Sequence, residues 1–312
     1  MKQIISNKLV FVLLIYISSS LQAHAVTNYQ TSAAEAFLKS FSQNDALSLE
    51  EANHYLANNS YGLKALSARI NGAKNLTLAI DNNTQDYRHA IDICLPVAMQ
   101  LEDDANEIIS KSLSFLLESG NVSVDIVFGA NNTAATATPD GIILALESVC
   151  KGVSSAKEAE SILLEYIAHE IIHVFQYRNS KRTSLNFTLL EISLIEGAAD
   201  YFSEIVMERS GELQKERETY GAKHEKMIWS EFSKVMYENE YFPWLYSKPK
   251  SNMPPDMGYW IGKRIIKKLY EQTPSKKQVI KDILVLKDAK RILNRSLYQN
   301  QISPLRYFQI FS

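Results

Sequence analysis

Apolar residues recur at three- and four-residue intervals through the first third of the chain, which is the period of an amphipathic helix. The pattern runs from Ser32 to Ser119, and Gly120 is a natural stop for the last helix. It then changes: residues 121–129 alternate between apolar and polar positions, and residues 142–149 form a second short apolar run. These two runs predict strands of a small antiparallel sheet, joined by a polar, turn-rich link at 130–141.

A second set of helical patterns fills most of the remaining chain. Five segments have apolar residues at helical spacing and predict helices, at 157–178, 188–209, 212–239, 258–271 and 275–287. Segment 241–258 is rich in proline and aromatic residues, which predicts an irregular but packed loop. Nothing between Val26 and Ser312 has the composition of a flexible linker. We therefore predict one continuous α+β domain, mostly helical, with a helical N-terminal lobe at 26–120 and a second region at 121–312.

Composition narrows the class of protein only a little. The chain has 312 residues, of which 46% are hydrophobic and 22% charged, with a net charge of −2. These values are typical of a globular protein with a sizeable core. Because the charge is close to neutral, there is no electrostatic case for binding nucleic acid or an anionic membrane.

The first 25 residues have the layout of a secretory signal peptide. Two lysines precede the nine-residue apolar run Leu9–Ile17, and small residues stand at Ala23 and Ala25, before a cleavage point after Ala25. The alternative is a transmembrane anchor, but nine residues are too few for a bilayer, which needs about 20. We therefore expect the mature chain to begin near Val26 and to be exported, either to a periplasm or to the medium, without stable membrane insertion.

The cysteine content allows one disulfide at most. Cys94 and Cys150 are the two cysteines of the chain, and in an exported protein they could close a long loop. The alternative is a pair of buried thiols. Neither cysteine is placed beside a histidine in the chain, so the sequence gives no sign of a thiolate zinc site.

Three polar residues, His169, Glu170 and His173, interrupt an otherwise apolar stretch with the spacing HExxH. In a helix, positions i and i+4 share one face, so both imidazoles would point at one metal ion, while Glu170 reaches its water without being a ligand. The alternative is a helix whose polar residues are satisfied by their neighbours. Because the flanking residues are mostly apolar, the helix should be buried, and buried histidines and carboxylates need partners. We therefore predict one zinc ion per chain.

A catalytic zinc site needs a third protein ligand and an open fourth position. Glu196 follows His173 by 23 residues, which is far enough for one helix to end and a second to pack beside it. Its neighbours are apolar or small, which is a poor setting for a solvated carboxylate. We predict Glu196 as the third ligand, with Glu191 and Glu204 as rivals.

Asp200 is one helical turn beyond Glu196, on the same face. There it could accept the free N–H of a zinc-bound histidine and so fix the tautomer of that ligand. The small residues 197–199 should let this helix approach the HExxH helix closely. The alternative is an amphipathic helix with solvated carboxylates.

These motifs carry a resemblance to a known family. The pair HEIIH and EGAAD resembles the gluzincin pattern, and the segment from PWLYSKP to IGKRIIKKLYEQ extends the likeness. Together they are similar to a largely uncharacterised family of predicted zinc-dependent proteases with HExxH, EGxAxYF and P-x-x-x-GY-x-IG motifs. The likeness covers about residues 120 to 300 and leaves out the N-terminal lobe. It implies a zincin-like fold, with a small antiparallel sheet packed on the HExxH helix.

The resemblance also implies the roles of the site residues: His169, His173 and Glu196 on zinc, Glu170 as general base, and Asp200 behind a ligand. The chemistry would be hydrolysis of a peptide bond, with Glu170 taking the proton of the attacking water and passing it to the leaving nitrogen. The motif GxMEN of the common metallo-aminopeptidases is absent, so we favour an endopeptidase.

A second hydrogen-bond donor should hold the oxyanion. Our candidate is Tyr259, in DMGYWIGK, because a phenol is neutral at pH 7 and can donate. The alternatives are that Tyr259 is a packed aromatic residue, or that His224 is the donor instead.

The substrate is expected to be a protein or peptide that pairs with an exposed sheet edge. By analogy with the fold, one of the two predicted strands would be the template, and the polar link between them is either a mobile flap or a simple loop. Two other functions remain open: a zinc hydrolase acting on a non-peptide amide or ester, and a non-catalytic protein that binds zinc and a partner.

Overall fold

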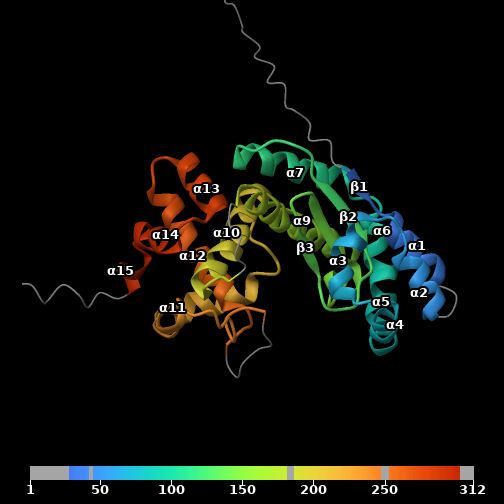
Figure 1. The fold of residues 1–312 in the computed structure, drawn as a ribbon. Helices are drawn as coiled ribbons and strands as arrows, with labels where there is room; N and C mark the ends of the chain where they lie inside the picture. The colour runs from blue at the N-terminus through green and yellow to red at the C-terminus, as the bar shows by residue number, and fades with distance from the viewer. Residues whose placement is uncertain (1–27, 42–44, 181–185, 247–252, 303–312) are drawn as a thin grey trace, which may run out of the picture.

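The computed structural model describes residues 28–41, 45–180, 186–246 and 253–302, which form an α+β fold that is mostly helical (Figure 1). The predicted fold class is thus confirmed. The predicted signal peptide lies outside the described residues. Among the helices described, we find none with the length and apolar character needed to cross a membrane.

The N-terminal lobe consists of helices that follow one brief strand; the helical periodicity predicted the helices but not the strand. Its elements are β1 (Asn28–Gln30), α1 (Ser32–Phe41), α2 (Leu49–Leu56), α3 (Tyr61–Ile70), α4 (Ala73–Asn82), α5 (Thr84–His89), the π-helix η1 (Ala90–Cys94), α6 (Leu95–Ala98) and α7 (Glu102–Leu116). Phe37 of this lobe stacks on Phe128, which follows the second strand, and Tyr55 and Tyr87 pack against Phe37. The hydroxyls of Tyr55 and Tyr87 donate to the carbonyls of Phe128 and Gly129. These contacts join the lobe to the sheet.

The sheet has four strands and is mixed, so the prediction of an antiparallel sheet is wrong in this respect. The strands are β1, β2 (Ser123–Val127), β3 (Ala135–Ala137) and β4 (Gly141–Ala145), in the order β1-β2-β4-β3. The two strands predicted from the sequence, β2 and β4, pair in parallel, with Ser123 opposite Gly141.

The polar link explains how two strands so close in sequence become parallel, since parallel neighbours need a connection of about a dozen residues or more. The link contains β3, which runs back antiparallel to β4 through a tight turn, with Thr136 opposite Ile143. The Ala-Thr-Ala run of β3 was too brief, and too poor in β-branched and aromatic residues, to be predicted as a strand. It occupies an edge of the sheet, where we had expected one of the two predicted strands to lie.

The second region is built from long helices that the sequence predicted to within four residues at each end. They are α9 (Ala156–Asn179), α10 (Leu189–Met207), α11 (Lys215–Val235), α12 (Met257–Gln272) and α13 (Lys276–Val285). The short helices α14 (Ala289–Ser296) and α15 (Tyr298–Ile302) were not predicted separately. The helix α8 (Leu146–Val149) corrects the prediction for 142–149, because the second predicted strand ends at Ala145 and the chain turns helical there. The α9 helix packs beside β3 and β4, and α3 packs on the sheet face that carries Asp125, Val127 and Ile143.

The glycines Gly197 of the EGAAD segment and Gly262 of the GYWIG segment lie where α10 crosses α12. A Cβ atom on Gly197 of α10 would collide with the backbone of Gly262 and Lys263 in α12, and one on Gly262 would collide with the carbonyl of Ser193. Gly197 therefore lets α10 approach α12, whereas the sequence led us to expect close approach to the HExxH helix. The two helices lie backbone against backbone, which ties the downstream motif to the site.

The two cysteines form a disulfide. Cys94, at the end of η1, is bonded to Cys150, directly after α8, and their Cα atoms are 6.4 Å apart. The bond links the N-terminal lobe to the segment that follows β4.

Candidate metal centre

The α9 helix carries the HExxH sequence through the interior of the protein. Ser155 caps its N-terminus by accepting a hydrogen bond from the Glu158 amide. Apolar side chains on all sides of the helix are fully buried, among them Ile167, Ile171 and Val174. This burial explains why the apolar flanks surround the motif, and it places the polar residues where each needs a partner.

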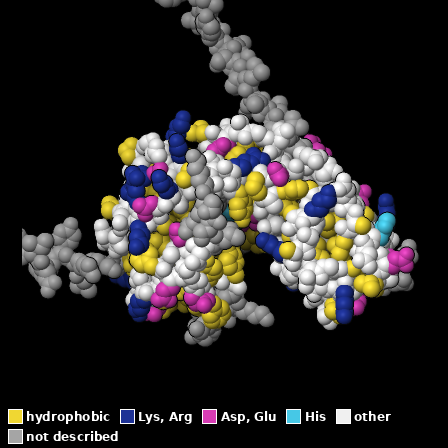
Figure 2. Space-filling view, in the orientation of Figure 1, with side chains coloured by type: hydrophobic (Ala, Val, Ile, Leu, Met, Phe, Trp, Pro, Cys, Tyr) yellow, Lys and Arg dark blue, Asp and Glu magenta, His cyan; other side chains and the backbone are white. Residues whose placement is uncertain are grey.

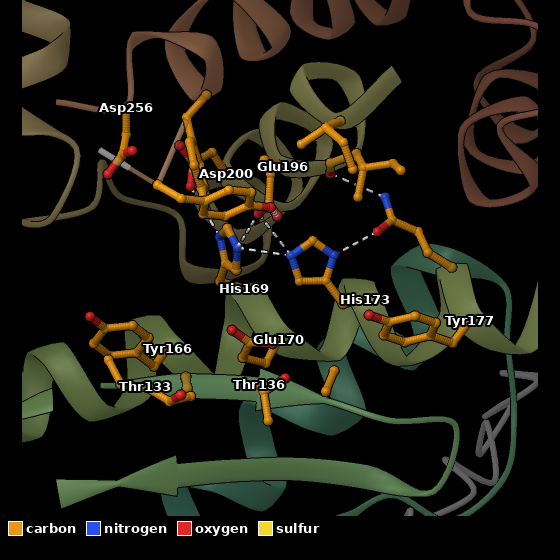
Figure 3. Close-up of a pocket in the computed structure, with 18 of the residues that line it drawn as sticks. Thr133, Thr136, Tyr166, His169, Glu170, His173, Tyr177, Glu196, Asp200 and Asp256 are labelled. Atoms are coloured by element: carbon orange, nitrogen blue, oxygen red, sulfur yellow. Dashed lines mark hydrogen bonds and ion pairs between the residues drawn. The ribbon is translucent and has the colours of Figure 1, made fainter. Parts of the chain in front are cut away.

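The third candidate ligand is brought in by α10. Thr188 and Glu191 form a capping box at the start of this helix, so Glu191 is occupied as a cap. Glu204 is 2.5 Å from the buried ammonium of Lys263, so it is committed to an ion pair. Glu196 instead points at the two histidines of α9 (Figure 3). Of the three carboxylates that the sequence offered, the structure brings Glu196 to the site.

Three donor atoms converge on one point. His169 Nε2 and His173 Nε2 are 3.0 Å apart, and Glu196 Oε2 is 3.4 Å from the first and 3.1 Å from the second. Among the described residues these three form the group that could hold a metal ion. Tetrahedral zinc with bonds of about 2.0–2.1 Å places its ligand atoms about 3.3 Å apart. The donor set therefore fits zinc in both chemistry and spacing.

The hydrogen bonds of the two imidazoles fix their tautomers. His169 Nδ1 donates to Asp200 Oδ1 at 3.0 Å, and His173 Nδ1 donates to Gln176 Oε1 at 2.7 Å. The amide of Gln176 is itself oriented, because its Nε2 donates to the carbonyl of Ile195. In the neutral imidazoles both Nε2 lone pairs then face each other and the Glu196 carboxylate. Three acceptors meeting in this way repel one another unless a cation lies between them.

The electrostatics of the site point the same way. Burial lowers the pKa of His169, but the hydrogen bonds with Asp200 and Glu196 outweigh burial and raise this pKa to about 10. Burial raises the pKa of Glu196, yet the imidazoles of His173 and His169 hold it well below its usual range. Burial also raises the pKa of Glu170. The carboxylates thus create a demand for positive charge at the position where the donor atoms converge.

A further layer of side chains holds these groups. Arg217 of α11 donates to Asp200 Oδ2 at 3.0 Å, and its guanidinium lies 4.9 Å from the centre of the Tyr259 ring. The Tyr259 ring in turn stacks 6.2 Å from the ring of His169. The hydroxyl of Tyr246 donates to Glu196 Oε1 at 2.7 Å. The candidate histidine ligands and the candidate glutamate ligand therefore each have a hydrogen-bond partner that orients them.

The donor atoms lie in a cavity of about 930 Å³, and the face in Figure 2 is hollowed between the half with α3 and β3 and the half with α10 and α12. Glu170 lines this cavity and lies between the histidines of α9 and Thr136 of β3 (Figure 3). Tyr166 and Thr133 flank it on one side, and Tyr177 flanks it on the other.

The strand beside Glu170 has an unpaired edge among the described residues. In the β3–β4 ladder, Ala134 O accepts from Ala145 and Thr138 N donates to Gly141. The antiparallel alternation then directs the backbone groups of Ala135 and Ala137 toward the cavity side, away from β4. An extended chain in the cavity would find donors and acceptors there.

Comparison with known families gives a match over residues 101–293, to the family described as "Predicted Zn-dependent protease (DUF2268)". The match spans more than half of the chain. The chain belongs to this family. No curated protein and no solved structure matches it.

In this member of the predicted Zn-dependent proteases, the sequence-based candidates fall into three groups. His169, His173, Glu196 and Asp200 come together as described, and Glu170 and Tyr259 line the same cavity. His224, the rival oxyanion donor, is exposed on α11, where it packs on Tyr220, and it is not among the residues that line the cavity.

Sequence reasoning missed Gln176, Arg217 and Tyr246 in this family member. Gln176 is three residues beyond His173, on the same helix face, so its position could have been noticed. Arg217 and Tyr246 reach the site from α11 and from the loop before α12, and no local pattern marks them.

Proposed function

We propose that the protein is an exported zinc-dependent endopeptidase of the gluzincin type. His169, His173 and Glu196 would hold the zinc ion, and Glu170 would act as general base. The observation that carries this proposal is the position of Glu170, beside the convergent donor atoms but outside them, at the wall of an open cavity. A purely structural zinc site has four closed ligands and no use for such a base.

Zinc bound by these residues would lower the pKa of a water molecule from 15.7 toward about 7 and polarise a substrate carbonyl. Glu170 takes the proton of the attacking water and delivers it to the leaving nitrogen. Burial favours the first of these steps, because it raises the pKa of the Glu170 carboxyl and so makes the carboxylate a stronger base toward the water proton.

The second donor in this proposal is Tyr259. Burial, together with Glu196 and Tyr246, raises the pKa of its hydroxyl well above the usual value, so the phenol keeps its proton at working pH. Tyr259 lines the cavity, and a neutral hydroxyl there donates to the developing oxyanion. Arg217 and His169 fix the ring by stacking on it.

Two features support an endopeptidase that acts outside the cytoplasm. The cavity continues past Glu170 in both directions, toward Tyr166 and toward Tyr177 (Figure 3), which leaves room for substrate on both sides of the cleaved bond. The Cys94–Cys150 disulfide is typical of proteins in an oxidising compartment, in agreement with the signal peptide that the first 25 residues predict.

The test compares metal content and proteolysis of the chain without residues 1–25 in four forms: wild type, Glu170→Gln, Glu196→Ala and Glu160→Gln. Glu160 is exposed on the same helix and serves as the matched control. We expect about one zinc per chain in all forms except Glu196→Ala. Cleavage of unfolded casein should fall about 10²–10⁴-fold in Glu170→Gln, which is the usual contribution of a general base.

Each outcome assigns the function differently. Full activity and full metal content in Glu170→Gln would rule out Glu170 as the base. Zinc binding without cleavage of any protein by the wild type would move the substrate to a non-peptide amide or ester, or leave a non-catalytic zinc protein. A wild type without zinc would refute the metal site.

A further inference from the structure

We propose that Arg69, on the N-terminal lobe, is a specificity-determining residue that binds a carboxylate of the peptide substrate next to the cleaved bond. This inference rests on the proposed peptidase function and adds a substrate class to it: peptides with Asp or Glu near the point of cleavage. Arg69 lies outside residues 101–293, the part of the chain that matches the family. The preference would therefore belong to this chain's lobe.

Arg69 is held in a fixed position relative to the sheet edge. It lies in the last turn of α3, between Leu66 and Ile70, both of which are buried in the core. Its backbone carbonyl accepts a hydrogen bond of 2.9 Å from the side chain of Asn132, just before β3. The end of α3 and the start of the edge strand are thus tied together, so the side chain of Arg69 starts from a defined point on the cavity wall.

The guanidinium faces the cavity without a partner of its own. Arg69 is exposed, lines the cavity together with Glu170, and forms no ion pair with any carboxylate of the described residues. Burial raises the pKa values of Glu170 and Tyr177, and Arg69 opposes both rises. Its charge is therefore felt on the side of the cavity where Glu170 and Tyr177 lie.

Four other charged groups that line the cavity are already committed. Arg217 pairs with Asp200, and Asp200 and Glu196 pair with the two histidines. Glu165 accepts hydrogen bonds from the backbone amides of Glu212 and Leu213. Arg69 is thus the basic residue of the described cavity wall that remains available to a ligand.

The chemistry of a guanidinium selects the ligand. Its planar fork matches a carboxylate, with two parallel hydrogen bonds that also carry charge. A peptide paired with the edge of β3 would carry its side chains past this position, so an acidic side chain is the source to which the proposal commits. The C-terminal carboxylate of a peptide has the same chemistry, and the experiment separates these two sources.

The experiment measures kcat/KM for fluorogenic peptides of one parent sequence, in which each position near the cleaved bond is Glu or Gln in turn. A second pair differs in having a free or an amidated C-terminus. For the wild type we expect about a tenfold preference for Glu at one position, the lower end for a hydrogen bond to a charged group, and a smaller preference at 0.5 M salt.

Three variants test the residue. Arg69→Gln should reduce the preference for Glu to less than about twofold, and Arg69→Glu should reverse it in favour of Lys at the same position. The matched control is Lys64→Gln, on the same helix: Lys64 is exposed, its ammonium contacts Asn59, and it is not among the cavity-lining residues. Lys64→Gln should keep the wild-type preference.

The results separate failure of the inference from failure of the proposed function. If the wild type cleaves peptides but shows the same Glu preference in Arg69→Gln, or none at all, the inference is overturned and the peptidase function stands. A preference for the free over the amidated C-terminus that Arg69→Gln abolishes would keep the carboxylate site but assign it to the chain end.

A binding measurement covers the case in which no peptide is cleaved. Fluorescence anisotropy of the same labelled peptides is recorded on the Glu170→Gln form, with and without Arg69→Gln. A Glu-over-Gln binding preference that depends on Arg69 would support the inference even if the peptidase function fails. Equal binding of both peptides in both forms would refute it.

Discussion

The two walls of the cavity differ in how their polar groups are satisfied. On the wall formed by α9, α10, α11 and α12, hydrogen bonds hold both histidines of the candidate metal centre, from Arg217 through Asp200 to His169 and from Gln176 to His173. On the opposite wall, β3 presents unpaired backbone groups and Arg69 has no counter-ion among the described residues. In the proposed function, the first wall is organised before any substrate arrives, whereas the substrate would complete the second.

Glu147 is the exception to this contrast. It is a buried carboxyl whose oxygens accept hydrogen bonds, and it lies behind the wall that β3 and Arg69 form. Its carboxylate accepts hydrogen bonds from the backbone amides of Gly129 and Asn131, at the start of the segment that leads to β3. Burial raises its pKa to about 7, although these hydrogen bonds oppose the rise. The largest effect that we expect is therefore a change, with pH, in the free energy of unfolding.

The folded protein binds the Glu147 proton more tightly than the unfolded chain does, where the ordinary pKa is 4.5. This contribution to the free energy of unfolding is therefore complete below pH 4.5, and it is lost as the pH rises through about 7, by at most about 3 kcal/mol. Urea unfolding between pH 4.5 and 8 should show this fall in the wild type and a smaller fall in Glu147→Gln. The exposed control Glu160→Gln should follow the wild type; parallel curves for all three would contradict the prediction.

The organised wall is the part of the site that the sequence could predict. His169 and His173 are one helical turn apart in α9, and Asp200 is one turn beyond Glu196 in α10. Glu196 follows His173 at a separation that fits one intervening loop, so local geometry was sufficient to predict the site. The fold class and the five long helices were accessible for the same reason. Gly197 was misassigned because spacing along α10 says which residues are small but not which neighbour, α9 or α12, makes use of them.

Gln176 tests how much the hydrogen bonds of the organised wall contribute to metal binding, because its side chain accepts a hydrogen bond from His173 on the same helix. Removing its acceptor in Gln176→Ala should weaken zinc binding about 10–100-fold, the usual cost of losing an outer hydrogen bond to a ligand. Gln176→Glu keeps an acceptor for His173 Nδ1 and should retain most of the affinity. Competition with a chromophoric chelator measures both.

The matched control for Gln176 is Asn179→Ala, one turn further along α9, where the side chain contacts Glu118 and Phe175. It should bind zinc as the wild type does. Equal affinities for Gln176→Ala and Asn179→Ala would show that His173 needs no support from this side chain.

The open wall was predicted poorly, and the reason is physical. A strand is identified by an alternation that one buried face imposes, but β3 lies at an edge and has three residues, so its sequence carries little of that pattern. The parallel pairing of β2 with β4 depends on where β3 lies. Because β3 was not predicted, this pairing was not predicted either. Arg69 could not be recognised either, since its role arises from the contact between α3 and the segment before β3, which are more than 60 residues apart.

The smallest effect should come from a single backbone group of the open edge. Ala135→Pro removes an N–H that points toward the cavity and leaves the ladder bonds to β4 at Ala134 and Thr138 in place. If substrate pairs with this edge, kcat/KM should fall about fivefold, the equivalent of one backbone hydrogen bond, while zinc affinity stays unchanged. The control is Thr136→Pro, which removes a group directed at β4 and should lower the melting temperature. A wild-type kcat/KM in Ala135→Pro would show that the substrate bypasses β3, and the two walls would then differ in packing alone.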